Sequence, residues 1–121
     1  MFAEVKESLP ISGDDYDAQI ITQIKAGALD LTTSAEIVLP GVISITRTRR
    51  QTGVLSGSEE WIVTDNSSVK DELIITAISI WCNMHIGNPP NIDNLRKSYE
   101  SLKGQMRLSR KYTNYGEVTE E

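Results

Sequence analysis

Hydrophobic residues recur at helical spacing in three long segments of this 121-residue chain. In the first segment they lie three or four positions apart, which predicts an amphipathic helix with an apolar face of Ile20, Ile21, Ile24, Ala28 and Leu31. Ser12 and Asp15 have the spacing of a capping box. The aspartates at 14, 15 and 17 suit the positive dipole end of a helix. We therefore expect this helix to start near Ser12 and to end at residues 32–34.

The second segment is the most apolar part of the chain. A start signal, Ser68 and Asp71, precedes it. One helical face would carry Val69, Leu73, Ala77, Ile80, Trp81 and Met84, and further isoleucines widen that face. A helix with so little polar surface needs cover from neighbouring helices or from another subunit. Gly87 suits the end of this helix, and Pro89 and Pro90 prevent its continuation.

The third segment predicts a helix capped by Asn91. Its apolar positions alternate in steps of three and four, a seam that suits packing against the second helix: Ile92, Leu95, Tyr99, Leu102 and Met106. The opposite face is mostly basic and carries Arg96, Lys97, Glu100, Lys103, Arg107 and Arg110. We expect the polar, acidic tail at 113–121 to be disordered.

The middle of the chain, residues 35–67, has a different character. β-Branched runs at 42–46 and 61–64 favour strand, and the connection Thr48–Glu60 is rich in Gly, Ser and Arg. This pattern predicts a long β-hairpin or a mobile loop with short extended arms. Arg47, Arg49 and Arg50 belong to a solvated loop or contact a phosphate or an acidic neighbour.

These elements predict a single domain over residues 1–121. We expect a mainly α fold: a small helical bundle of three long helices plus a short N-terminal helix at Phe2–Leu9, stopped by Pro10. A long β-hairpin-like loop lies between the first and second long helices. The predicted core comprises Ile20, Ile24, Leu73, Ala77, Ile80, Trp81, Met84, Leu95, Tyr99, Leu102 and Met106.

Charge and cysteine content narrow the classes of function. The formal net charge is −5, so the protein as a whole lacks the basic field of a nucleic-acid binder. Cys82 is the single cysteine and stands in the most apolar run, where we expect a small buried hydrophobe. The first ten residues do not have the pattern of a signal peptide. The run Leu73–Ile86 is too short and too polar to span a bilayer.

Catalytic signatures are missing from the sequence. The lone histidine, His85, has no nucleophile or second histidine at a telling spacing. The aspartates at 14, 15 and 17 lack the spacing of a calcium loop, and Glu59 and Glu60 are adjacent rather than arranged as an acid and a base. No phosphate-binding glycine motif or nucleophile elbow is present. We expect neither an enzyme nor a bound metal or cofactor.

Several segments, taken in order, resemble one protein family. They are Asp14–Ala18, Val69–Ile78, Ile80–Asn83, Gly87–Pro89, Ser98–Ser109 and Tyr112. This order and spacing, together with the chain length, resemble the head–tail connector (adaptor, or head-completion) proteins of long-tailed phages and prophages, which are often labelled DNA-packaging proteins. The resemblance covers most of the chain outside residues 35–67. That middle segment is longer and more hairpin-like than the usual connection in the family.

The resemblance implies a role in the virion. Such proteins are small helical bundles that assemble as a ring, commonly twelve-fold, beneath the portal protein. The ring extends the channel through which double-stranded DNA passes without being read, and it docks the next stopper or tail component. The protein would be made in the bacterial host cytoplasm. An acidic chain suits such a channel, because tight phosphate contacts would slow the DNA.

The interface residues expected from charge and resemblance lie in two groups. They are Arg47, Arg49, Arg50 and Trp61 in the middle segment, and Arg96, Lys97, Arg107, Arg110 and Lys111 near the C-terminus. A solvated helix face is the alternative for the second group. Two other classes of protein stay open: a small helical protein- or DNA-binding regulatory module, and a small enzyme. Residues 88–91 fit a helix break better than the tight turn of a helix-turn-helix.

Overall fold

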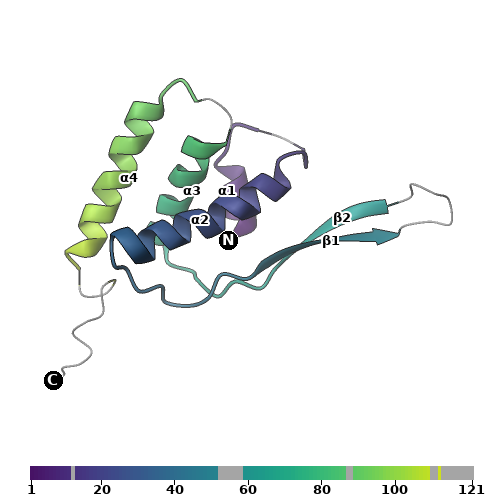
Figure 1. Ribbon diagram of the computed structural model, residues 1–121, viewed down its shortest axis with the longest axis horizontal. Coiled ribbons are helices and arrows are strands. Elements are labelled where there is room, and N and C mark those ends of the chain that lie inside the picture. The colour runs from purple at the N-terminus through teal and green to yellow at the C-terminus, as the bar shows by residue number, and fades with distance from the viewer. Residues whose placement is uncertain (12, 52–58, 87–88, 110–111, 113–121) are drawn as a thin grey trace.

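The computed structural model describes residues 1–11, 13–51, 59–86, 89–109 and 112. Within these residues the chain is mainly helical, with four helices and one two-stranded antiparallel sheet. The elements are α1 (Phe2–Glu7), α2 (Asp17–Ser34), β1 (Ile45–Gln51), β2 (Glu59–Asp65), α3 (Glu72–His85) and α4 (Ile92–Arg107). Figure 1 shows the helices gathered into one body, from which the two strands project as an arm. The mainly α fold with an inserted hairpin is therefore confirmed.

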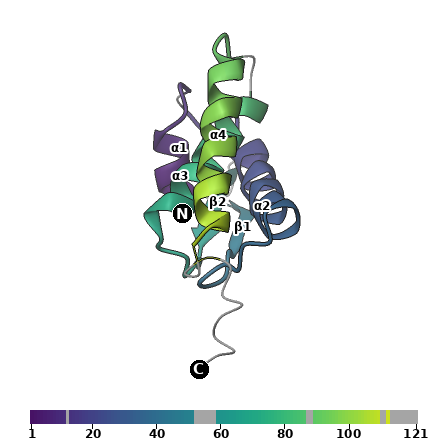
Figure 2. The same ribbon diagram turned by 90° about the vertical axis from the view of Figure 1, so that its left-hand side faces the viewer.

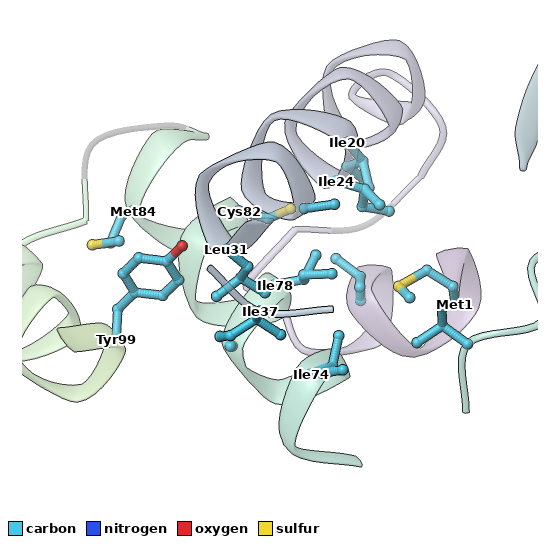
Figure 3. Packing of buried hydrophobic residues seen from close by; sticks show 14 of the residues in the cluster. Met1, Ile20, Ile24, Leu31, Ile37, Ile74, Ile78, Cys82, Met84 and Tyr99 are labelled. Carbon is cyan, nitrogen blue, oxygen red and sulfur yellow. The ribbon is translucent and has the colours of Figure 1, made fainter. Parts of the chain in front are cut away.

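The core forms around α3, which contacts each of the other three helices. Ile74, Ile78 and Cys82 are fully buried along one side of α3. Figure 3 shows Cys82 and Ile78 facing Ile24 and Leu31 of α2, with Ile74 further along α3 near Ile37. Burying a side chain of this size contributes about 1.5–3 kcal/mol, so this contact holds the body together. Among the described residues, no helix has both the length and the hydropathy needed to cross a membrane.

The buried side of α3 agrees only in part with the predicted one: Val69, Ala77 and Met84 are buried as expected. Leu73 was expected in the core but is 37% exposed, and Ile80 and Trp81 are only partly buried. The fully buried positions 74, 78 and 82 lie one residue after the predicted ones, because α1 and α2 both pack against that side.

The predicted N-cap of α3 is also corrected. Asp71, not Ser68, caps α3 by accepting hydrogen bonds from the backbone N–H groups of residues 73 and 74, at 2.9 and 3.2 Å.

The start of α2 lies later than predicted. Its N-cap is Tyr16, so Asp14 and Asp15 precede the helix and only Asp17 lies in its first turn. Ser12 lies outside the described residues. Asp17 is buried, and its carboxylate pairs with Lys6 of α1 at 2.8 Å. This ion pair ties α1 to the beginning of α2 and explains why the helix begins with an inward-facing acid.

The predicted seam of α4 is confirmed. Tyr99 and Met106 are buried, and three further apolar residues of α4 pack on the core: Ile92, Leu95 and Leu102. Asn91 occupies the N-cap position, although its side chain makes no capping hydrogen bond. Lys103 was expected on the solvated face but turns inward to pair with Asp30 of α2 at 3.2 Å. Gly87 and the tail at 113–121 lie outside the described residues.

Candidate functional site

At the base of the arm, residues 42–44 and 66–68 are hydrogen-bonded to each other without forming regular strand. The strands were predicted to start at Val42, yet β1 starts at Ile45. Residues 42–44 still run beside residues 66–68. The Ser68 and Asn66 N–H groups donate to the carbonyls of Val42 and Ser44, at 2.9 and 2.7 Å. The hydroxyls of Ser68 and Ser67 accept from the N–H groups of Val42 and Ser44 in return. Side-chain bonds thus replace part of the regular ladder.

The base of the arm is locked to the helical body. Ile45 is 1% exposed, and it pairs across the sheet with Asp65. The Asp65 carboxylate accepts hydrogen bonds from the backbone N–H groups of Phe2 and Ser67, at 2.7 and 2.9 Å. Burial opposes ionisation of Asp65, but the hydrogen bonds from Ser67 and Phe2 outweigh it and hold the pKa of this carboxyl well below its usual range. The arm therefore leaves the body in a fixed direction.

The three arginines of the middle segment lie on a strand, which corrects their predicted place in a loop. β1 extends through Gln51, and Glu59 and Glu60 begin β2. Arg49 pairs with Trp61 and Arg50 with Glu60, so the two pairs lie on opposite faces of the arm. The run T-R-T-R-R-Q has almost no apolar residues, which is why its strand character was missed. Its alternation of β-branched and long side chains was the available signal.

Trp61 is the main exposed hydrophobic side chain of the arm. It is 51% exposed. The guanidinium carbon of Arg47 lies 3.9 Å from the centroid of the indole ring, and that of Arg49 lies 5.5 Å away. These cation–π contacts hold the indole in place. Arg47 and Trp61 also border a hollow of about 490 Å³ together with Asp14 and Asp15, which precede α2. On the opposite face, Arg50 forms an ion pair with Glu60.

The chemistry of the arm favours a protein partner over a phosphate. Residues 45–51 and 59–65 contain three arginines and three carboxylates, so the arm has no net positive charge. A DNA-contacting ribbon needs a net basic surface. Tryptophan and arginine, by contrast, are the residues that most often dominate the binding energy of protein–protein interfaces. The arm combines both on one face.

The basic residues of α4 form a separate surface. Arg96, Lys97 and Arg107 are exposed, and Arg96 pairs locally with Asp93 at 3.3 Å. Figures 1 and 2 place α4 and the arm at opposite ends of the molecule. The predicted interface residues therefore do not converge on one site. Arg110 and Lys111 lie outside the described residues.

A polar cluster between α2 and α4 was not predicted. The Tyr99 hydroxyl donates to the Asp30 carboxylate at 2.6 Å, and the Lys103 ammonium donates to the same oxygen at 3.2 Å. Burial and this bond raise the pKa of Tyr99, so the phenol stays protonated. Asp30 was overlooked because it stands on the polar side of its helix in the sequence. The cluster borders a cleft of about 370 Å³ that Trp81 and His85 also line.

Two potentially reactive side chains are held in unreactive settings. Burial raises the pKa of the Cys82 thiol to about 12, so the thiol is protonated at neutral pH. His85 is exposed, stacks on Trp81 with ring centroids 4.1 Å apart, and has its Nδ1 2.8 Å from the Trp81 carbonyl oxygen. Within the described part of the chain, no three His, Cys, Asp or Glu side chains gather as a metal site would require.

A second surface, which we call the α1–α3 groove, was also missed by the sequence analysis. It consists of two adjoining hollows of about 370 and 300 Å³ between α1 and α3. Ile75 and Ile80 supply its apolar floor. Thr76 of α3 lines both hollows. Glu4 of α1 and Glu72 of α3 stand on opposite sides of it. Ile75 and Ile80 are therefore only partly covered in the single chain.

Comparisons with known proteins do not extend these observations. No protein-family model, no curated protein and no solved structure matches this chain.

Proposed function

We propose that this chain is a structural protein of a phage virion, a head–tail connector that forms a ring below the portal. In this role it extends the DNA channel and docks the next stopper or tail component. The helices α2, α3 and α4 are the three-helix bundle of each subunit, and the arm is its assembly element. The proposal combines the family resemblance of the sequence with the surfaces that the single chain leaves uncovered.

The observation that carries the proposal is the arm. It projects from the body with Trp61 half-exposed between two arginines. A two-stranded hairpin alone is at best marginally stable in water. Tryptophan is a residue type that often anchors protein–protein interfaces. A neighbouring molecule that covers Trp61 would stabilise the arm and give it a role in assembly.

The charge of the molecule suits passage of DNA. The net charge of −5 gives no general attraction for phosphate. A ring subunit that bound DNA tightly would release many counterions and retain the strand it should let through. The exposed arginines and lysine of α4, at the end opposite the arm, supply a second surface for the portal or the next component.

A regulatory DNA-binding module is the alternative, and the geometry favours it less. Such a module needs a helix with a free basic face. On α4, Lys103 points inward to Asp30, and Arg96 pairs with Asp93. The remaining basic side chains of the described part of α4 do not make a continuous reading face.

The test is the solution mass of the protein, measured by light scattering over a concentration series, alone and mixed with the portal protein of the same genome. We expect a ring-sized species or a stable complex of ring stoichiometry with the portal. A protein that ignores the portal at every concentration contradicts the connector role. Saturable, salt-sensitive binding to duplex DNA in that case supports the regulatory module.

A further inference from the structure

Both outer edges of the arm present backbone groups that its own ladder does not use. At the base of the arm, hydrogen bonds join Ser44 to Asn66 and Val42 to Ser68. The same register continues without a break through β1 and β2, so the even-numbered residues of both strands face their partner strand. In an antiparallel ladder the alternate residues point their N–H and C=O groups away from the partner. The odd-numbered residues therefore line the two outer edges.

The outer part of each edge lies clear of the helical body. Figure 1 shows the two strands extending beyond the helices. Apart from the ladder itself, no backbone hydrogen bond among the described residues involves Arg47 on β1 or Trp61 and Val63 on β2. An edge of this kind is a template for a further strand, in which main-chain hydrogen bonds supply the affinity.

Charge decides which strand each edge accepts. β1 carries Arg47, Arg49 and Arg50 and no carboxylate, whereas β2 carries three carboxylates and no cation. Two β1 edges side by side would bring arginines together, and two β2 edges would bring carboxylates together. A β1 edge beside a β2 edge avoids both repulsions. Within one chain β1 and β2 already pair in this way, and Arg50 forms an ion pair with Glu60.

We infer that β1 of one copy pairs along its outer edge with β2 of the next copy, so that neighbouring arms form one antiparallel sheet. The occupant of each edge is a second copy of this chain. Its β2 presents to the outer edge of β1 the same sequence that β1 already pairs with in its own chain. Arms that lie side by side and point the same way make this contact antiparallel, because β1 runs outward and β2 runs back.

The contact joins two different edges and is therefore head-to-tail. Repeated head-to-tail contacts give a closed ring or an open filament, and a closed ring of arms leaves no strand edge unpaired. This inference rests on the proposed function, for which it names the contact between ring subunits.

Two proline variants block the two edges separately. Arg47→Pro removes an outward N–H group from β1, and Trp61→Pro removes one from β2. Proline is tolerated in an edge strand where the N–H group faces away from the ladder. The matched controls are Arg47→Val and Trp61→Val. They lose the same side chains but keep the backbone donors, and valine favours strand.

The first measurement is self-association by sedimentation velocity up to the solubility limit. We expect each proline variant to associate about tenfold more weakly than its valine control, because one hydrogen bond is lost and a carbonyl of the neighbouring copy is left unpaired. An equimolar mixture of the two proline variants should form dimers at concentrations where each alone is monomeric. In that mixture the intact β2 edge of Arg47→Pro meets the intact β1 edge of Trp61→Pro.

A second measurement uses no proline and so does not depend on how well proline is tolerated. Repeating the register of the arm between copies places Thr48 opposite Ile62 of the next copy, with Cα atoms about 4.5 Å apart. A disulfide spans this distance. Thr48→Cys and Ile62→Cys are made in separate chains, mixed and oxidised, while the native Cys82 stays buried. We expect the mixed disulfide and neither of the two symmetric ones.

Several results would overturn the inference. They are an unmodified protein that stays monomeric up to its solubility limit, proline variants that associate as tightly as their valine controls, and symmetric disulfides in place of the mixed one. A disulfide between two Thr48→Cys chains would indicate a symmetric contact between two β1 edges. If these results appear while the portal is still bound, the contact between arms is wrong and the connector role stands.

Discussion

The helical body and the arm of this protein are stabilised in opposite ways. In the body, α3 is surrounded by three helices, and its residues Ile74 and Ile78 are fully buried in the core. In the arm, two strands pair only with each other, and their largest apolar side chain is half exposed. The arm joins the body at its base, where Ile45 is buried, Val63 packs against the core and Asp65 accepts a hydrogen bond from Phe2.

This difference assigns the folding of the chain to the helical body and its association with other molecules to the arm. The body can reach its structure from the burial available within one chain, whereas the outer arm has no such source of stability. Substitutions in the body should therefore change stability, and substitutions on the outer arm should change association. The following variants test that separation, beginning with the largest expected effect on stability.

Ile78→Ala should be the most damaging. Ile78 is fully buried where α3 meets α2, so its truncation leaves a cavity as well as losing apolar contact. We expect a loss of about 3 kcal/mol in the free energy of unfolding, measured by urea denaturation. Ile78→Val is the matched control and should lose about 1 kcal/mol. Equal, small losses in both variants would show that the body is loosely packed.

Asp65→Asn should weaken the junction between body and arm. The low pKa of Asp65 means that its ionised form stabilises the fold above pH 3.8, the usual value for this carboxyl. This contribution is lost as the pH falls through the folded-state pKa. We expect the variant to lose about 2 kcal/mol in the free energy of unfolding near neutral pH. Its free energy of unfolding should also fall less steeply than that of the unmodified protein as the pH is lowered. Parallel curves of stability against pH for the two proteins would contradict the role assigned to this carboxylate.

Gly27→Ala should strain the crossing of α2 and α3. A methyl group at residue 27 would lie 2.9 Å from the Trp81 ring, whose indole N–H also donates to Gln23 at 3.0 Å. We expect a net loss of about 1 kcal/mol, because the clash exceeds the gain in helix propensity. Gly104→Ala is the control. No atom lies within 4 Å of its added methyl group, so this variant should gain about 0.5–1 kcal/mol. A gain in both variants would show that Trp81 moves freely.

Trp61→Ala should have the smallest effect on stability of the single chain. The side chain is half exposed, and the guanidinium groups of Arg47 and Arg49 stack on its ring. We expect a change within about 0.5 kcal/mol, measured in dilute solution where the protein is monomeric. A loss comparable to that of Ile78→Ala would mean that the arm is part of the folding core.

Much of the body could be predicted from the sequence, because helix periodicity reports which residues face inward. The apolar face of α2 and the seam of α4 were predicted correctly from spacing alone. The face of α3 was predicted only in part, since isoleucines on several sides make its pattern ambiguous. Only packing against α1 and α2 decides that Ile74 is buried and Leu73 is exposed.

The sites were less predictable than the helices. Arg47 and Trp61 were singled out by residue type, but their stacking depends on the register of β1 against β2. The groove depends on the approach of α1 to α3, and the Asp30–Tyr99 bond joins positions far apart in the sequence. No local pattern encodes such contacts. They follow from tertiary packing alone.

The most direct test of the account is hydrogen exchange of backbone amides in the free protein and in its complex with the portal of the same genome. The account predicts unchanged exchange in the buried parts of α2 and α3. We expect slower exchange in β1 and β2 once the ring assembles. Slower exchange confined to other regions, or no complex at all, would contradict it.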